Sequence, residues 1–205
     1  NAYFNPSYNE IVFPAAILQP PFYNYQADEA VNYGGIGAVI GHEISHGFDD
    51  SGARYNADGN LVDWWTADDL KQFTILGDQL AAQYSALEPL PGIHVDGKFT
   101  LGENIGDLGG LSIAIKAYKM SLEGKASPVL AGFSGEQRVL LGWAQCWLNK
   151  SREEALRNQI ATDPHSPAKF RINGVVRNIP EFYTAFNIKP TDSLYLAPEK
   201  RVKIW

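Results

Sequence analysis

The chain has 205 residues, a formal net charge of −6, 45% hydrophobic residues and one cysteine. This length and apolar content are enough for one sizeable hydrophobic core and favour a single domain over residues 1–205. The acidic balance argues against nucleic acid as a main partner, which requires clustered Lys and Arg, and the lone Cys146 excludes an internal disulfide and a cysteine-based metal site.

Two short strands and one buried helix are predicted in the first quarter of the chain. Residues 1–4 and the alternating residues 9–13, which end at Pro14, are typical of strands. The apolar stretch from Asp28 to about Phe48 is rich in glycine, so a helix there would be held by packing rather than by local propensity. We expect Asp28 to cap this helix.

Three further helices are predicted downstream, over residues 66–86, 101–122 and 134–158. Ser134 is the expected cap of the last helix. A short hairpin is expected around residues 96–97, just before the second of these helices. No apolar run reaches the roughly 20 residues of a spanning helix, so we expect no membrane span. Together these elements predict a mainly α-helical fold with a few short strands.

The segment 42–46 reads His-Glu-Ile-Ser-His and lies inside the first predicted helix. Residues four apart face the same side of a helix, so His42 and His46 can reach one metal ion with Glu43 beside it. The alternative is a pair of exposed helix histidines flanking a solvated carboxylate. Because an H-E-x-x-H match is rare by chance, the pattern favours a hydrolytic zinc site.

A hydrolytic zinc site takes three protein ligands and leaves a fourth position for water. The candidates for the third ligand are His94, His165 and the acidic residues. Glu103 and Asp107 are four apart at the start of an apolar helix, and buried carboxylates are costly unless they are paired or bind a metal. We therefore expect Glu103 to be a ligand and Asp107 to accept a hydrogen bond from an imidazole N–H. The alternative is that the helix dipole alone favours both carboxylates.

The metal-site residues belong to a longer series of motifs that spans the whole chain. It consists of Asn-Ala-Tyr-Phe at 1–4, Pro-Pro-Phe at 20–22, the extended zinc motif at 42–50, Asp-Trp-Trp at 63–65, Gly-Glu-Asn-Ile and Asp107 within 102–107, His-Ser-Pro at 165–167 and Trp205. In its order, this series resembles the C-terminal catalytic portion of the neprilysin-like zinc metalloendopeptidases, in a bacterial-type member.

The resemblance implies a zincin (thermolysin-like) catalytic fold and zinc-dependent hydrolysis of oligopeptides. It implies that one zinc ion is held by His42, His46 and Glu103, with Glu43 as the general base and Asp107 as a catalytic outer-shell carboxylate. Asp49, three residues after His46, either orients that ligand or only ends the helix.

The resemblance also implies the substrate contacts. His165, backed by Asp163, would face the tetrahedral intermediate, and Arg171 would hold a substrate carbonyl. Asn1 and the backbone of Ala2 would bind the peptide main chain as an added strand.

A pocket for the residue after the scissile bond is implied as well, with a preference for bulky apolar side chains. The alternative is that its residues are ordinary core residues. The implied lining is Ile17, Phe22, Ala38, Val39, Cys146 and Trp147.

Members of the family are several times longer than this chain. We therefore expect a fragment that lacks the N-terminal helical cap domain, with a peptide substrate and the missing N-terminal part as partners. The alternatives are a catalytically incomplete fragment and a zinc-stabilised peptide-binding module. By analogy we expect a location in the bacterial envelope or outside the cell, with the cytoplasm as the alternative.

Overall fold

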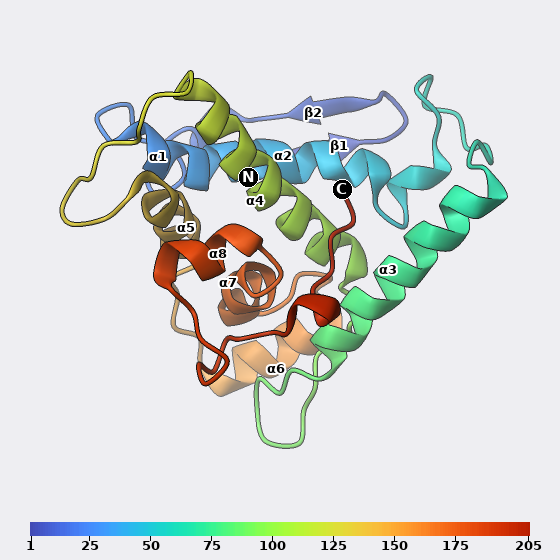
Figure 1. Cartoon of the computed structure of the whole chain (residues 1–205). Coiled ribbons are helices and arrows are strands. Elements are labelled where there is room, and N and C mark those ends of the chain that lie inside the picture. Colours follow the sequence, from blue (N-terminus) through green and yellow to red (C-terminus); the bar gives the residue numbers. More distant parts are fainter.

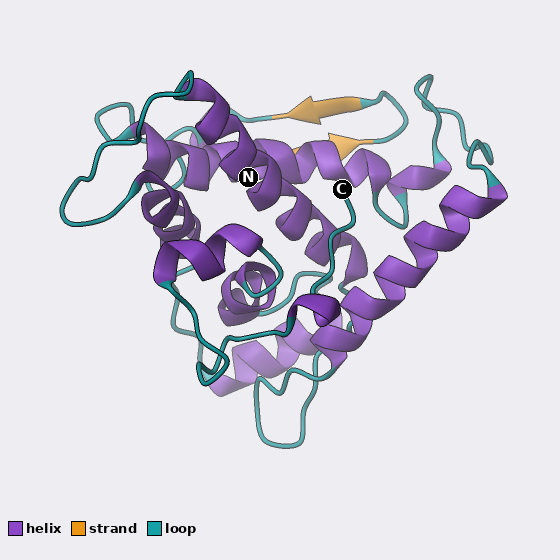
Figure 2. Cartoon of the chain, in the orientation of Figure 1, coloured by secondary structure: helices purple, strands orange, loops and turns teal.

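Eight α-helices and one two-stranded sheet form the fold (Figures 1 and 2), in a computed structural model that describes all 205 residues. The helices surround one main core, and the fold is mainly α-helical as predicted. The elements are β1 (Tyr3–Asn5), β2 (Glu10–Val12), α1 (Glu29–Asn32), α2 (Ala38–Ser45), α3 (Ala67–Ser85), α4 (Leu101–Ser121), α5 (Gly135–Cys146), α6 (Glu153–Thr162), α7 (Ala168–Val176) and α8 (Pro180–Phe186).

The helix predicted over residues 28–48 is present, but it is not a uniform α-helix. A π-helical turn at Tyr33–Gly37 joins α1 to α2, and a 3-10 turn at His46–Phe48 ends the run. Asp28 is the N-cap residue of α1, as expected, but its side chain makes no capping hydrogen bond. Its Oδ2 instead lies 2.6 Å from Nε of the buried Arg138, so Asp28 ties the start of this segment to α5.

Glycines allow α2 and α4 to cross closely. A Cβ placed on Gly41 of α2 would lie 2.8 Å from the Cα of Gly110 on α4, which is tighter than ordinary contact. In Figure 1, α4 crosses α2 near the middle of the molecule. Gly41 therefore serves this crossing, whereas the earlier Gly34 and Gly35 allow close approach of α5 and of the Phe22 backbone.

The helices predicted over 66–86 and 101–122 are confirmed as α3 and α4. Thr66 caps α3 by accepting a hydrogen bond from the backbone N–H of Asp69. The hairpin expected around 96–97 is wrong, because the segment is a turn in which the Asp96 carboxylate accepts from the backbone N–H groups of Lys98 and Phe99.

The single helix predicted over 134–158 is also wrong. Ser134 does cap α5 in a capping box with Gln137, but α5 ends at Cys146 and the chain turns before α6. Arg152 has extended backbone angles, and two glutamates follow in the first turn of the new helix. The polar residues between the two helices are exposed, so nothing packs there to hold a continuous helix.

The two predicted strands are confirmed as an antiparallel pair, in which Tyr3 pairs with Val12 and Asn5 with Glu10. The hairpin lies along α2 in Figure 1, which brings the first residues of the chain next to the zinc motif. A small cluster of Ala2, Ile17, Ile36 and Val39 fills the space beneath it.

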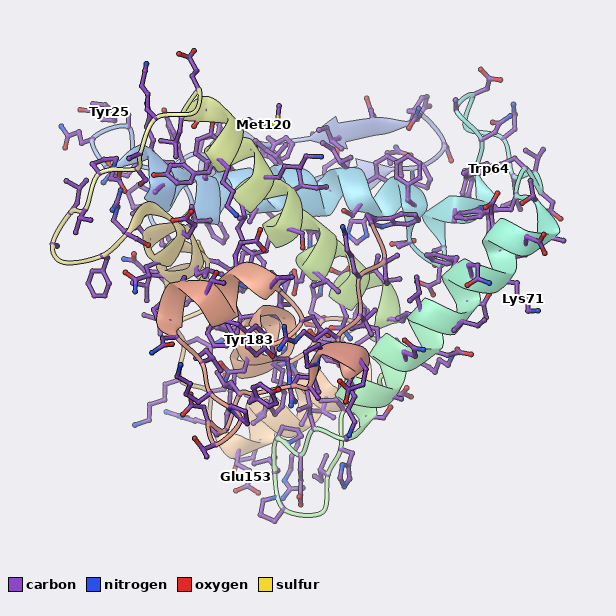
Figure 3. The ribbon with its side chains drawn as sticks, viewed as in Figure 1. Tyr25, Trp64, Lys71, Met120, Glu153 and Tyr183 are labelled. Atoms are coloured by element: carbon purple, nitrogen blue, oxygen red, sulfur yellow. The ribbon has the colours of Figure 1, made fainter.

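The main core lies between α3, α4, α5 and α7. Its largest buried side chains include Trp143, Tyr84, Ile105 and Ile115. Side chains such as Met120 and Tyr25 point outward at the periphery (Figure 3) and are 70% and 78% exposed. None of the helices has the length and apolar character that crossing a membrane requires.

Candidate metal and peptidase site

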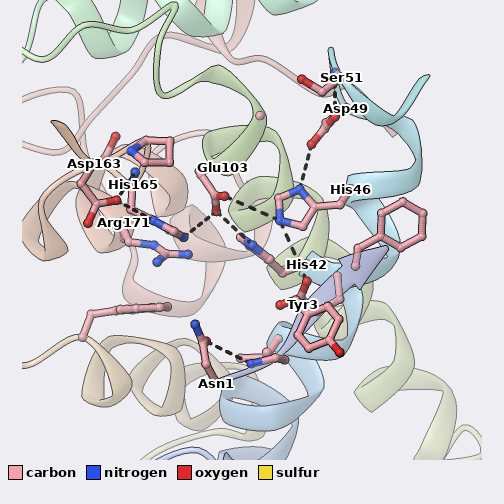
Figure 4. A pocket seen from close by; sticks show the side chains of 18 of the residues that line it. Asn1, Tyr3, His42, His46, Asp49, Ser51, Glu103, Asp163, His165 and Arg171 are labelled. Carbon is pink, nitrogen blue, oxygen red and sulfur yellow. Dashed lines mark hydrogen bonds and ion pairs between the residues drawn. The ribbon is translucent and has the colours of Figure 1, made fainter. Parts of the chain in front are cut away.

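Three side chains from two crossing helices converge on one point. His42 and His46 come from α2 and the residue that follows it, and Glu103 comes from the first turn of α4 (Figure 4). Nε2 of His42 lies 3.2 Å from Oε2 of Glu103, and Nε2 of His46 lies 3.8 Å from Oε1. All three ligand atoms lie within 4.8 Å of one another, so they can hold a metal ion.

A carboxylate stands behind each imidazole. Nδ1 of His42 lies 2.9 Å from Oδ1 of Asp107, and Nδ1 of His46 lies 2.8 Å from Oδ2 of Asp49. Because an ionised carboxylate can only accept, each Nδ1 carries the proton and each Nε2 presents a lone pair to the common point. Asp49 also accepts from the backbone N–H groups of Ser51 and Gly52, so it both orients His46 and ends the helix.

The convergence of acceptors fits a cation. Oε2 of Glu103 is buried and receives no hydrogen bond of good geometry, although imidazole nitrogens of His42 and His165 lie 3.2 and 3.0 Å away. When the His42 and His46 imidazoles are neutral, their two lone pairs and the Glu103 carboxylate therefore face one another. This donor set suits zinc, which takes imidazole nitrogen and carboxylate oxygen as ligands.

The pKa shifts of His42 and Glu103 also show that the site favours a positive charge. Burial lowers the pKa of His42, but the Asp107 and Glu103 carboxylates outweigh burial and raise the pKa to about 9. Burial raises the pKa of Glu103, but the imidazoles of His165 and His42 outweigh it and hold that pKa well below its usual range. The site therefore attracts either a proton or a metal cation in its place.

Glu43 lies beside the convergence point. Its Oε2 is 4.0 Å from Nε2 of His46, and the residue is 5% exposed and lines the cleft. Burial raises the pKa of this carboxyl above its ordinary value. A buried carboxylate with a raised pKa next to a metal position can act as a proton acceptor near neutral pH.

Asp107 and Arg171 form a buried ion pair behind His42. Nε and Nη2 of Arg171 donate to the two carboxylate oxygens at 2.7 and 2.6 Å, and Asp107 is fully buried. The guanidinium also stacks 3.8 Å above the ring of Trp147. Nη1 of Arg171 makes no hydrogen bond within the protein, and Arg171 lines the cleft, so this nitrogen is available to a ligand.

His165 reaches the same centre from the loop between α6 and α7. Its Nε2 lies 3.0 Å from Oε2 of Glu103, and its Nδ1 lies 2.7 Å from Oδ1 of Asp163. The contact with Glu103 raises the pKa of His165. The His165 side chain is 38% exposed, so a ligand in the cleft can touch it.

The site opens into a cleft of about 840 Å³. Two residues implied for the apolar pocket do not line it. Ala38 is fully buried in the main core, and the Cys146 thiol donates toward the backbone carbonyls of Pro21 and Gly142. The predicted substrate residues that do line the cleft are Asn1, Ala2, Ile17, Phe22, Val39, Trp147 and Arg171.

Two buried polar residues next to the site were not predicted. Ser166 donates to Oδ1 of Asn104 at 2.8 Å, and both residues are at most 1% exposed. Both residues lie inside motifs of the resemblance, directly after Glu103 and His165, but the motifs assigned them no role.

Comparisons with known proteins agree with this geometry. The zinc metalloprotease ZMP1 of Mycobacterium tuberculosis, solved in complex with an inhibitor, has a TM-score of 0.98 and 61% identity over 100% of this chain and 32% of its own. Human neprilysin is 44% identical over 100% of this chain and 28% of its own length. The neutral endopeptidase of Lactococcus lactis is 42% identical, again over the whole of this chain and 31% of its own length.

The chain thus spans about a third of the length of the relatives it matches. Peptidase family M13 matches residues 1–202, which is nearly the whole sequence. The resemblance to the neprilysin-like peptidases and the zincin-type helical fold are thereby confirmed. The chain belongs to peptidase family M13.

Proposed function

We propose that this protein is a zinc-dependent endopeptidase that hydrolyses oligopeptides. The observation that carries the proposal is the meeting of two imidazole lone pairs and the Glu103 carboxylate at one point, with Glu43 beside it, in an open cleft. Family membership supports the same reaction.

We assign the zinc-binding role to His42, His46 and Glu103, which fit the ion in number and in chemistry. When bound, zinc supplies a Lewis acid that lowers the pKa of water and polarises a carbonyl. Glu43 then accepts the proton of the attacking water and passes it to the leaving nitrogen. Its buried position beside His46 keeps the carboxylate close to that water.

Two donors from the opposite wall meet the reacting carbonyl. His165, held by Asp163, donates from Nε2 to the oxyanion that develops as water adds. Arg171 donates from Nη1 to a substrate carbonyl while its other nitrogens remain paired with Asp107. Asp107 itself orients both His42 and Arg171, so it acts on catalysis through these two residues.

The hairpin provides the binding edge for the peptide. Asn1 and Ala2 line the cleft directly before β1, so a peptide main chain can pair with them as an added strand. Phe22, Val39 and Trp147 form the apolar wall of the cleft, and Phe22 meets Trp147 edge-to-face at 6.2 Å. This wall favours a bulky apolar residue after the scissile bond.

The alternative of a zinc-stabilised binding module has less support. A structural zinc site is closed by four protein ligands, whereas the group here has three. His94, the remaining histidine, is exposed on a different loop and lines no part of the cleft. We also propose an envelope or extracellular location, by analogy with the family, which cell fractionation would test.

Cleavage of a quenched fluorescent peptide with Phe or Leu after the scissile bond tests the proposal. We expect turnover by the zinc-loaded protein, loss with a chelator and recovery with added zinc. The Glu43→Gln variant should bind zinc and lose about 10²- to 10⁴-fold in kcat, the usual contribution of a general base. Glu154→Gln, at an exposed glutamate of α6, is the matched control and should keep full activity. Turnover that survives chelation, or full activity in zinc-loaded Glu43→Gln, would overturn the assignment.

A further inference from the structure

We propose that Asn104 and Ser166 are positioning residues that hold His165 at the reaction centre, an inference that rests on the proposed function. Each is the next residue after a group of the site: Asn104 follows Glu103 on α4, and Ser166 follows His165 on the loop before α7. One buried hydrogen bond between them therefore connects the two walls of the cleft directly behind the His165–Glu103 contact.

The bond belongs to a buried chain of polar groups. Ser166 Oγ donates to Asn104 Oδ1 at 2.8 Å, and Asn104 Nδ2 donates to Thr100 Oγ1 at 2.9 Å. The Thr100 hydroxyl donates in turn to the backbone carbonyl of Asp96 at 3.0 Å. The exposed fractions of Ser166, Asn104 and Thr100 are 1%, 0% and 4%. Water cannot reach these buried groups to replace a lost hydrogen-bond partner. This series of hydrogen bonds therefore fixes the distance between α4 and the loop before α7.

The other contacts of His165 do not fix that distance. Asp163 holds the ring from within the same loop, and its side chain is 44% exposed. The contact between His165 and Glu103 lies inside the cleft, where a ligand competes with it. Apart from the His165–Glu103 contact, the Ser166–Asn104 bond is the only side-chain hydrogen bond between residues 163–167 and α4. The buried Arg171–Asp107 pair also joins α7 to α4, but it lies six residues further along the chain. The Ser166–Asn104 bond is therefore the buried tie nearest to the imidazole.

Loss of the bond should affect the transition state more than substrate binding. His165 meets the charge that develops on the carbonyl oxygen, and a misplaced donor loses part of that stabilisation. Complete removal of an oxyanion donor typically costs about 10²- to 10³-fold in kcat, so a displaced but present donor should cost roughly tenfold. The peptide main chain contacts Asn1 and Ala2 on the other side, so KM should change by less than about twofold.

Ser166→Ala is the test variant, and Ser166→Cys, which fills the position with a poor hydrogen-bond donor, replaces it if the alanine variant does not fold. The matched control is Asn178→Ala. Asn178 is also a buried amide, 3% exposed, and its Oδ1 accepts from Gln83 and from the backbone N–H of Val202, away from the cleft. The control removes four hydrogen bonds of a buried side chain where Ser166→Ala removes one, so it sets an upper bound on the effect of lower stability alone.

Two readouts separate positioning from stability. The first is the split between kcat and KM for the zinc-loaded protein on the fluorescent peptide. The second is the Kd of a phosphonamidate peptide, which mimics the tetrahedral geometry, compared with that of a cleavage-product peptide. We expect Ser166→Ala to lower kcat about tenfold and to weaken only the phosphonamidate by a similar factor, as a transition-state contact requires.

The control variant should change neither quantity by more than about twofold, as expected for a site away from the reaction. Ser166→Ala with the kcat and phosphonamidate affinity of the unmodified protein would overturn the inference, as would equal losses in Asn178→Ala. If the unmodified protein cleaves no peptide, the proposed function fails, and the two ligand affinities still decide the role of Ser166. If it binds neither ligand, both proposals fail.

Discussion

Gly106 provides the sharpest test of how the fold holds the metal site. It lies one turn after Glu103 on α4 and faces the ring of His42. A Cβ at this position would lie 2.8 Å from both Cε1 and Nδ1 of His42 and 3.2 Å from its Cγ. Ordinary carbon contacts begin near about 3.5 Å, so Gly106→Ala forces the imidazole to move by roughly 0.7 Å or more.

The displacement has two separable costs. Overpacking costs about 1–3 kcal/mol, whereas alanine gains about 1 kcal/mol of helix propensity over glycine, so metal-free stability should fall by about 0–2 kcal/mol. Nδ1 of His42 also moves relative to Asp107, and the loss of such a partner weakens metal affinity about 10- to 100-fold. That factor corresponds to about 1.4–2.7 kcal/mol of zinc-binding free energy.

Zinc titration against a competing chelator and urea unfolding of the metal-free protein measure the two costs. Gly77→Ala in the middle of α3 is the matched control, because its Cβ would meet only a Leu101 methyl at 3.5 Å. The control should gain about 1 kcal/mol of stability and keep its zinc affinity. If Gly106→Ala bound zinc as tightly as the unmodified protein, close packing of α4 against the His42 ring would not be what holds this ligand.

Three further predictions concern groups around the site and the helix behind it. Arg171→Met leaves the fully buried Asp107 carboxylate without its guanidinium partner, so urea unfolding should show a loss of about 3–5 kcal/mol, and a loss under 1 kcal/mol would contradict the buried pair. Burial raises the pKa of Cys146 to about 11, so alkylation at pH 8 should be slow and should accelerate with pH toward 11, whereas a plateau below pH 9 would show an ordinary thiol. Ser134→Ala removes the capping bond to Gln137, so the free energy of unfolding should fall by about 1 kcal/mol without any change in zinc affinity.

The metal centre was predictable because its signals are local. His42 and His46 lie four apart on one helix, and so do Glu103 and Asp107, so the helical period alone places each pair on one face. Buried carboxylates must be neutralised, which points to a cation without any knowledge of the tertiary structure. The sequence could not reveal that α2 and α4 cross with their backbones in contact at Gly41.

The predictions that failed in whole or in part depend on contacts that are remote in the sequence. Asp28 has the residue type of a helix cap, but Arg138, 110 positions later, takes its carboxylate. Ala38 and Val39 were both expected at the apolar pocket, yet successive residues of a helix point about 100° apart. Val39 lines the cleft, whereas Ala38, rotated away from it, faces the core.

The positions of Ser166 and Asn104 show a different limit of sequence reasoning. Neither residue has a distinctive spacing, and a serine before a proline is an ordinary loop residue. Their importance comes from burial to at most 1% exposure, which only the packing of α7 against α4 creates. The hydrogen bonds of a polar residue matter most when water is excluded from them. The periodicity of hydrophobic residues does not predict which polar residues are buried in this way.

The charges around the site explain why one arrangement serves both binding and orientation. The carboxylates of Glu43, Asp49, Glu103 and Asp107 gather around the point where the imidazoles meet, and Arg171 is the only guanidinium among them. With the imidazoles neutral, four carboxylates against one guanidinium leave an excess of negative charge that a divalent cation reduces. Two of these carboxylates also fix the imidazole tautomers, so the groups that attract the cation are the same groups that direct lone pairs toward it. The close crossing of α2 and α4 holds the imidazoles and the carboxylates in fixed positions relative to one another. A change in that crossing should therefore weaken metal binding before it weakens the core.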